Sequence, residues 1–175
     1  MLVIGDEILS GRTQDANMHH LAGCLGPHGI DLREVRVVAD DPLAIRHAVK
    51  TLSDGHDHVF TSGGIGPTHD DITADNVAAA FGANIDIRDD ARAVLQAHYD
   101  AQGIELNEAR LRMARIPDDA QLIDNPISAA PGFSLGNVHV MAGVPVIFQA
   151  MLQGLLPGLS GGAPVLSASL SLLRA

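Results

Sequence analysis

The eleven residues T-S-G-G-I-G-P-T-H-D-D, from Thr61 to Asp71, constrain the fold more than any other segment of this chain. They follow the apolar pair Val59-Phe60, which is typical of the end of a buried strand. Glycines let backbone N–H groups approach a ligand closely, and a following helix directs the positive end of its dipole to the same place. The segment therefore predicts a strand, an anion-binding loop and a helix in succession.

The rest of the chain continues this alternation of strands and helices. Apolar runs and turn residues predict strands at 2–4, 30–38, 59–60, 121–123, 133–135 and 138–141. Helical spacing and capping residues predict helices at 15–26, 42–54, 73–81, 90–102, 108–114 and 147–156. We expect a mostly parallel sheet with helices on both faces, and Gly136-Asn137 predicts a hairpin that adds an antiparallel edge. Core positions are expected at Leu43, Ala44, Ala48, Val49, Leu52, Phe60, Phe81 and Phe148.

Charge and composition narrow the possible partners. Asp and Glu number 21 against 11 Lys and Arg, and the net charge of −10 disfavours binding to nucleic acids or anionic membranes unless basic residues cluster. They do not cluster in the sequence. One cysteine excludes a disulfide framework, and no apolar run approaches the roughly 18 residues that span a bilayer, so a cytoplasmic location is expected. The first apolar run is short for a strand, and we expect a few residues to be missing before it.

The glycine-rich segment does not match the common nucleotide-binding loops. A Walker loop needs Gly-Lys followed by Ser or Thr, which is absent, and the dinucleotide pattern fails because His69 stands three residues after Gly66. A purely structural turn remains an alternative. His69 is a candidate ligand contact, whereas the other histidines have no metal-ligand spacing and are expected to be solvated.

Acidic residues accompany the glycines. Asp70 and Asp71 would repel a phosphate unless a divalent cation lies between them and the anion, or unless one of them caps the next helix; both interpretations stay open. The first loop, G-D-E-I-L-S-G-R-T-Q-D-A-N, adds Asp6, Glu7 and Asn17 after a strand. These side chains could complete a metal site or hold a ribose or pterin edge, and an exposed polar loop is the alternative.

Four motifs, in order, carry a family resemblance: G-D-E-I-L-S-G-R-x-x-D-x-N, T-S-G-G-I-G-P-T-H-D-D, N-P-I-S-A-A-P-G-F and M-A-G-V-P. Together they resemble the MoaB/Mog-type molybdopterin-binding domain, most closely the N-terminal half of CinA proteins and the molybdopterin-binding-like half of FAD synthases. The resemblance runs from Leu2 to Leu159. It predicts one domain at 1–159 and leaves 160–175 as a tail, which would be an edge strand, an ordered arm or a non-native end.

The resemblance implies a three-layer α/β/α fold in a homo-oligomer, a dimer or trimer, with a ligand site in the loops named above. Asp6 and Asp70 or Asp71 would hold a divalent cation, Mg²⁺ or Co²⁺, or promote transfer. The expected ligand and phosphate contacts are Gly5, Glu7, Asn17, Ser62, Gly63, Gly64, Gly66, Pro67, Thr68, His69, Gly143 and Pro145.

Three functional hypotheses follow. The first is a domain that binds molybdopterin or its adenylate through the phosphate at the glycine-rich loop. The second is a metal-dependent pyrophosphatase acting on ADP-ribose or related dinucleotides. The third is a regulatory or interaction module without catalytic activity. The sequence contains no motif that distinguishes a pterin ring from an adenine ring.

Overall fold

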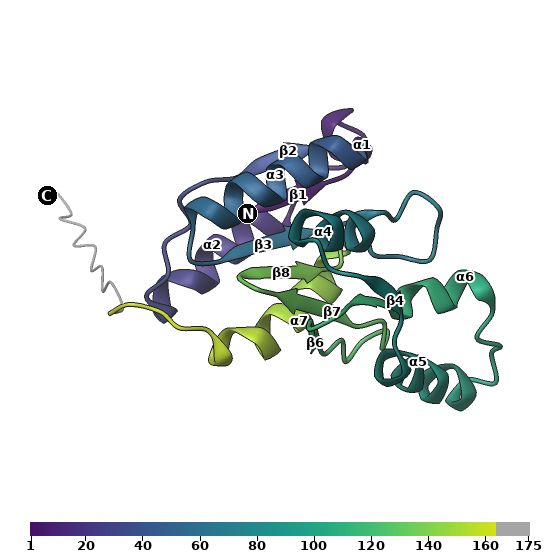
Figure 1. Cartoon of the computed structure of the whole chain (residues 1–175). Helices are drawn as coiled ribbons and strands as arrows, with labels where there is room; N and C mark the ends of the chain where they lie inside the picture. Colours follow the sequence, from purple (N-terminus) through teal and green to yellow (C-terminus); the bar gives the residue numbers. More distant parts are fainter. Residues whose placement is uncertain (164–175) are drawn as a thin grey trace, which may run out of the picture.

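The computed structural model describes residues 1–163, so most of the predicted tail lies outside the described residues. A six-stranded sheet forms the centre, with strand order β2-β1-β3-β8-β7-β6 (Figure 1). The strands are β1 (Leu2–Ile4), β2 (Arg36–Val38), β3 (Val59–Ser62), β4 (Ile85–Ile87), β5 (Arg115–Pro117), β6 (Gln121–Ile123), β7 (Gly132–Leu135) and β8 (Val138–Met141). Four neighbouring strands, β2, β1, β3 and β8, are parallel, and β7 pairs antiparallel with both β8 and β6. The mostly parallel sheet with an antiparallel edge is therefore confirmed.

Helices cover both faces of this sheet. They are α1 (Asp6–Leu9), α2 (Asn17–Leu25), α3 (Pro42–Gly55), α4 (Thr73–Phe81), α5 (Asp89–Ala101), α6 (Glu108–Leu111) and α7 (Pro145–Leu155), with 3₁₀ turns η1 (Gly26–His28), η2 (Arg112–Ala114) and η3 (Leu156–Gly158). One buried cluster joins α3 and α4 to the sheet, and a second joins α2 and α7 to its other face. The predicted layers of helices on both faces of the sheet are thus present.

A small lobe beside the main sheet was not predicted. Strands β4 and β5 pair antiparallel there, next to α5 and α6 (Figure 1). Ala91, Leu95 and Ile116 of this lobe belong to the same buried cluster as α3 and α4. Each strand has only three residues, too few for a sequence pattern of period two to stand out. Because Ala91, Leu95 and Ile116 belong to the shared cluster, the lobe is continuous with the main core.

Four local predictions were wrong. The strand expected at 30–38 is reduced to Arg36–Val38, because β1 offers only three residues for pairing. Leu43 is 74% exposed, because the buried face of α3 consists of Ile45, Ala48, Val49 and Leu52, and Leu43 lies off that spacing. Phe81, the last residue of α4, is 40% exposed. A four-residue helix, α1, also interrupts the loop expected at 5–14.

A chain of hydrogen bonds crosses three strands at the end of the sheet where β3 and β8 begin. The Ser134 hydroxyl lies 2.8 Å from His139 Nδ1, His139 Nε2 lies 3.1 Å from His58 Nδ1, and His58 Nε2 lies 2.9 Å from the Ser160 carbonyl oxygen. A carbonyl only accepts, so His58 Nε2–H donates to it, His139 Nε2–H donates to His58, and Ser134 donates to His139. His139 is buried, which corrects the expectation of solvated histidines.

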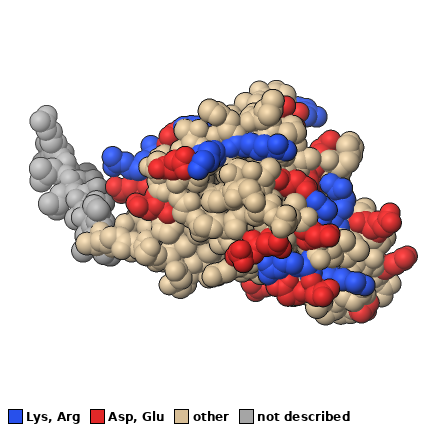
Figure 2. All heavy atoms as spheres, in the orientation of Figure 1, with Lys and Arg blue, Asp and Glu red and all other residues tan. Residues whose placement is uncertain are grey.

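Surface charge follows no single stripe. Figure 2 shows several small groups of Lys and Arg, mixed with Asp and Glu, on the face in view. Within residues 1–163, no helix combines the length and apolar composition needed to cross a membrane.

Candidate functional site

The loops that follow the parallel strands meet at one end of the sheet, as the topology requires. The glycine loop, residues 63–71, follows β3 and begins against the first strand. A Cβ atom on Gly63 would lie 2.2 Å from the carbonyl oxygen of Ile4, and the φ of Gly63 is +109°. Both facts exclude a side chain there. Gly143, in the loop after β8, packs on the other side, since its Cβ would lie 3.1 Å from Gly63 Cα.

Thr73, the first residue of α4, holds the glycine loop in a tight curve. Its hydroxyl donates to the carbonyl oxygen of Gly63 at 3.0 Å, and its N–H donates to that of Gly64 at 2.9 Å. Gly64 adopts a φ of +69°. The next three N–H groups, those of Gly64, Ile65 and Gly66, donate to no other residue in the described part of the chain. Consecutive free N–H groups in such a turn form an anion-binding concavity.

Asp71 closes the glycine loop. Its carboxylate accepts from the Thr68 N–H at 2.8 Å and from the Thr68 hydroxyl at 2.6 Å, and it lies directly against Gly66. Neither aspartate caps α4, whose N-cap is Ile72 without a side-chain bond, so the helix-cap interpretation is wrong. Asp70 instead pairs with His69 at 3.1 Å, and the two side chains are 74% and 91% exposed. Pro67 and Thr68 are exposed beside them.

Four carboxylates gather beside the glycine loop. The N–H of Asp6 donates to Asp40 Oδ2 at 3.0 Å, which ties the loop after β1 to the loop after β2. Burial raises the pKa of Asp40, the Asp6 N–H bond opposes this rise, and the negative charges of Asp6, Glu7 and Asp71 add to it. The structure thus brings Asp6, Glu7 and Asp71 within electrostatic range of Asp40. Asp70 does not act on Asp40 in this way, and its place in the site stays a prediction.

Sequence reasoning missed Asp40. A signal existed, because Asp40 stands two residues after the parallel strand β2, where ligand-binding side chains collect. Gly5 directly follows β1, as expected, and a Cβ atom on it would lie 2.6 Å from Glu7 Oε1; its part in the site stays a prediction.

Asn17 joins three segments at the base of the site. Its amide Nδ2 donates to Ser62 Oγ at 2.7 Å and to the carbonyl oxygen of Gly143 at 2.8 Å. The residue is only 2% exposed, and its Oδ1 atom has no partner among the described residues. An unpaired buried oxygen is costly, and such atoms are frequent where a ligand or water is bound. Pro145, expected to close the site, occupies the first turn of α7, and its part in the site stays a prediction.

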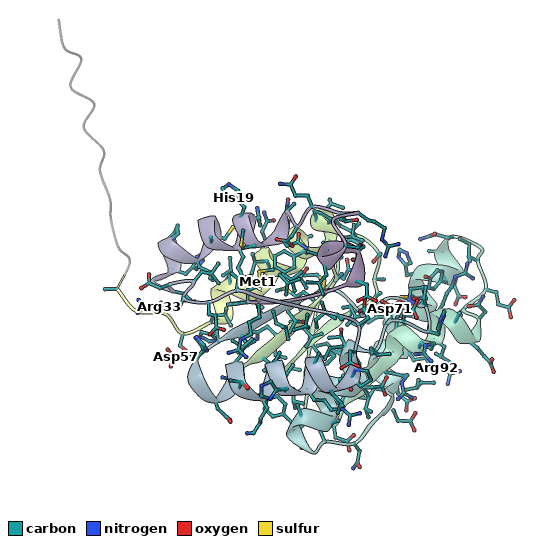
Figure 3. The ribbon with its side chains drawn as sticks, turned by 90° about the horizontal axis from the view of Figure 1, so that it is seen from above. Met1, His19, Arg33, Asp57, Asp71 and Arg92 are labelled. Atoms are coloured by element: carbon teal, nitrogen blue, oxygen red, sulfur yellow. The ribbon has the colours of Figure 1, made fainter. Side chains whose placement is uncertain are left out.

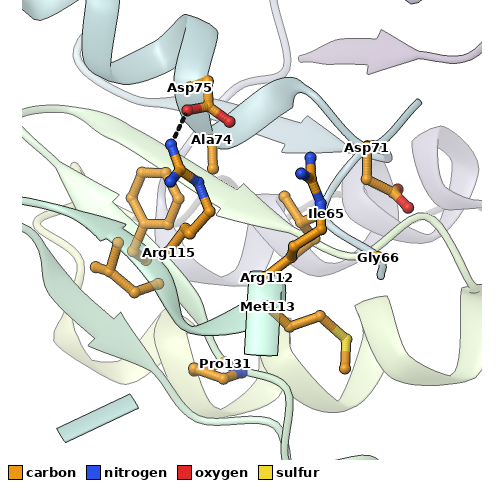
Figure 4. Close-up of a pocket in the computed structure, with 12 residues that line it drawn as sticks. Ile65, Gly66, Asp71, Ala74, Asp75, Arg112, Met113, Arg115 and Pro131 are labelled. Carbon is orange, nitrogen blue, oxygen red and sulfur yellow. Dashed lines mark hydrogen bonds and ion pairs between the residues drawn. The ribbon is translucent and has the colours of Figure 1, made fainter. Parts of the chain in front are cut away.

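A small cavity of about 20 Å³, room for one water molecule, separates the glycine loop from the small lobe. Ile65, Met113, Ile116 and Phe133 supply apolar walls, and Arg112 and Arg115 supply charge (Figure 4). Arg115 forms an ion pair with Asp75. Both arginines were missed from the sequence, because nothing local indicates that η2 and β5 face the loop.

The expected metal site is not preformed. Among residues 1–163, no group of three or more His, Cys, Asp or Glu side chains is arranged to hold a metal ion. Mg²⁺ is usually bound by one or two carboxylates together with substrate phosphates rather than by a protein cage. A cation at these carboxylates therefore stays a prediction.

Comparisons with known proteins agree with this geometry. A family described as "Probable molybdopterin binding domain" matches residues 1–161. Protein Ta0487 of Thermoplasma acidophilum is 35% identical over 159 residues, which are 89% of this chain and 61% of that protein. A CinA-like protein of Citrifermentans bemidjiense is 36% identical over 92% of this chain and 40% of its own length. The chain thus spans less than two thirds of the length of these curated relatives.

Solved structures give the same assignment. The crystal structure of a CinA protein of unknown function from Thermoplasma acidophilum has a TM-score of 0.81 and 34% identity, covering 90% of this chain and 94% of the other. MoaB of Thermus thermophilus, a molybdopterin biosynthesis enzyme, has a TM-score of 0.57 and 18% identity over 90% and 88% of the two chains, a likeness of fold alone. With its four motifs, its sheet order and the match over residues 1–161, the chain belongs to the MoaB/Mog-type molybdopterin-binding domain family and is CinA-like.

Proposed function

We propose that this domain binds the phosphate group of a pterin or adenine nucleotide at the glycine loop. One observation carries the proposal: the N–H groups of Gly64, Ile65 and Gly66 are free within the described chain, while Thr73 and Asp71 tie down the two ends of the loop. A loop that only reversed the chain would not need three consecutive donors without acceptors. Phosphate oxygens are strong acceptors that such donors select.

A divalent cation, Mg²⁺ or Co²⁺, belongs to the proposal as a companion of the ligand. The carboxylates of Asp6, Glu7, Asp40 and Asp71 stand beside the anion-binding loop, and their combined charge would repel a bare phosphate. When bound, the cation would neutralise charge between carboxylates and phosphate. The protein's own part is to hold Asp6 and Asp71 in place, the first through the Asp40 contact and the second through Thr68.

Molybdopterin or its adenylate is the first candidate ligand, because the family to which the chain belongs is described by that ligand. Titration of the purified protein with molybdopterin, with and without Mg²⁺, tests this. We expect saturable binding that Gly64→Ala abolishes, since a Cβ there would lie 2.1 Å from the Thr73 hydroxyl. Gly23→Ala in α2 meets nothing within 4 Å and serves as the control. Equal binding by the wild type and Gly64→Ala would contradict the proposal.

Hydrolysis of a dinucleotide diphosphate, such as ADP-ribose, is the second candidate, and the four gathered carboxylates favour it. Incubation with ADP-ribose and Mg²⁺ or Co²⁺, followed by detection of AMP, tests it. Asp71→Asn is expected to remove turnover while the protein stays folded, and the same substitution at exposed Asp31 is the control. No AMP with either cation would dismiss hydrolysis. No binding of either ligand would leave a regulatory or interaction module as the remaining proposal.

A further inference from the structure

Among residues 1–163, Arg112 lines the cavity beside the glycine loop and has no partner for its guanidinium. Other arginines are engaged: Arg36 with Glu34, Arg88 with Asp90 and Arg115 with Asp75. The guanidinium of Arg112 forms no ion pair or hydrogen bond with another described residue, although Asp71 and Asp75 line the same cavity. A free guanidinium next to paired acids is available to an additional anion.

The position of Arg112 complements the glycine loop. It lies on η2 in the small lobe, and its side chain extends toward the loop between Ile65 and Asp71 (Figure 4). The Ile65 N–H group belongs to the free donors of that loop within the described chain. Arg112 and these donors therefore approach the same space from two different lobes. Arg115, three residues further on, cannot take this part because Asp75 already neutralises it.

We propose that Arg112 is a ligand-binding residue that clamps a phosphate or diphosphate group against the glycine loop. The inference rests on the proposed function and deepens it, because it defines the ligand class as a phosphate ester and sets its orientation. A guanidinium presents two parallel N–H groups that match two phosphate oxygens, which a point charge does not. The cavity that Arg112 and the glycine loop line has room for only one water molecule, so the phosphate would meet Arg112 at the mouth of the cavity and the ring would lie further out.

The charges around the glycine loop also support a role for Arg112 in binding an anion. Four carboxylates surround the loop, and Arg112 is the cation that lines the cavity and remains unpaired within the described chain. An anion at the loop would meet the positive charge of Arg112. Loss of the guanidinium should weaken binding most for ligands with the largest phosphate charge, and less at high salt, where screening already weakens the attraction.

The test compares Arg112→Gln with Arg92→Gln. Arg92 lies on α5, is also exposed and unpaired among the described residues, and does not line the cavity (Figure 3). Binding of inorganic pyrophosphate and of ADP-ribose is measured by calorimetry at low and high salt, with thermal unfolding of each variant as a check on folding. We expect Arg112→Gln to lower both affinities at least about tenfold at low salt, less at high salt, and Arg92→Gln to change neither.

The outcomes separate the two proposals. Unchanged affinity of Arg112→Gln for both ligands would overturn the clamp while the proposed function stands. Binding of pyrophosphate that depends on Arg112, without binding of ADP-ribose or molybdopterin, would support the clamp and overturn the proposed nucleotide or pterin ligand. No binding of any of these by the wild type would overturn both. An equal loss in Arg92→Gln would also overturn the clamp, because it would show a general effect of net charge.

Discussion

The strands β3 and β8 carry polar groups at both of their ends, and the two ends differ in how these groups are satisfied. Where the strands begin, the Ser134 hydroxyl and the ring nitrogens of His139 and His58 all have partners. Where they end, Asn17 Oδ1 has none in the described chain, and the N–H groups of 64–66 are free there. A satisfied polar chain fixes structure, whereas a preformed set of unsatisfied groups awaits a ligand.

The largest effect is expected at the ligand end. Gly63→Ala forces a Cβ into contact with the Ile4 carbonyl at 2.2 Å and places alanine at a φ of +109°, so we expect a loss of about 4 kcal/mol in the free energy of unfolding. Urea denaturation measures it. Gly154→Ala, on the exposed side of α7 with nothing within 4 Å, should instead gain about 0.5–1 kcal/mol. Equal effects of the two substitutions would mean that the contact between β1 and β3 is looser than described.

A change of pH should alter the free energy of unfolding through His139, near the beginning of β3 and β8. Burial, and secondarily the nearby His58, lowers the pKa of His139 from 6.5 to about 4. Its folded pKa lies below its unfolded pKa, so the unfolded chain binds the proton more tightly. The contribution of neutral His139 to the free energy of unfolding is therefore complete above pH 6.5. It is lost as the pH falls toward 4, and the total loss is about 3 kcal/mol.

Replacement of His139 tests this assignment. Unfolding curves of the wild type and of His139→Gln between about pH 7 and pH 4 are compared, and the variant should lack that part of the pH dependence. The same slope in both proteins would place the titrating group elsewhere. Binding at the other end of the strands should not change with this substitution.

Two substitutions with smaller expected effects compare the two ends of β3 and β8 directly. Asn17→Ala and Ser134→Ala each remove hydrogen bonds that link strands or loops, and each should lower stability by about 1–2 kcal/mol. Only Asn17→Ala should also weaken binding of ADP-ribose or pyrophosphate, because it releases the loop at Gly143 from the site. Calorimetric titration of both variants decides. A similar loss of binding in Ser134→Ala would remove the functional distinction between the ends.

The smallest expected effect concerns the two neighbouring aspartates. Asp71→Ala removes the acceptor of both Thr68 bonds and should cost about 1 kcal/mol, while Asp70→Ala, on an exposed side chain, should not change the unfolding midpoint measurably. Thermal unfolding of the two variants measures the difference. Identical midpoints would mean that Asp71 does not hold the glycine loop.

The sequence predicts the features that depend on the conformation of a few neighbouring residues or on the direction of a strand. The glycine loop, the hairpin at Gly136 and the end of α4 at Gly82 follow from backbone conformations that few other residues adopt, and the structure has all three. The loops that meet beyond β1, β3 and β8 follow from strand direction, and the structure brings Asn17, Ser62 and Gly143 together there.

The remainder depends on tertiary contacts. Arg112 faces the glycine loop only because the small lobe packs on the core of α3 and α4, and no local pattern around Arg112 indicates that contact. The expected core position of Leu43 failed for a related reason, because spacing gives the width of an apolar face and not which edge of it meets the sheet. The metal expectation stays a prediction, because among residues 1–163 no group of three or more His, Cys, Asp or Glu side chains is arranged to hold a metal ion without a ligand.

The continuity of the small lobe with the main core bears on the timing of ligand exchange. Ala91, Leu95 and Ile116 pack in the same buried cluster as α3 and α4. The lobe that carries Arg112 therefore shares its core with the sheet, and a movement of the lobe as a unit would disrupt that core. Close-packed protein interiors resist such displacement. We therefore expect the release rate of a bound phosphate ligand to be set by the strength of its phosphate contacts and not by the opening of a domain.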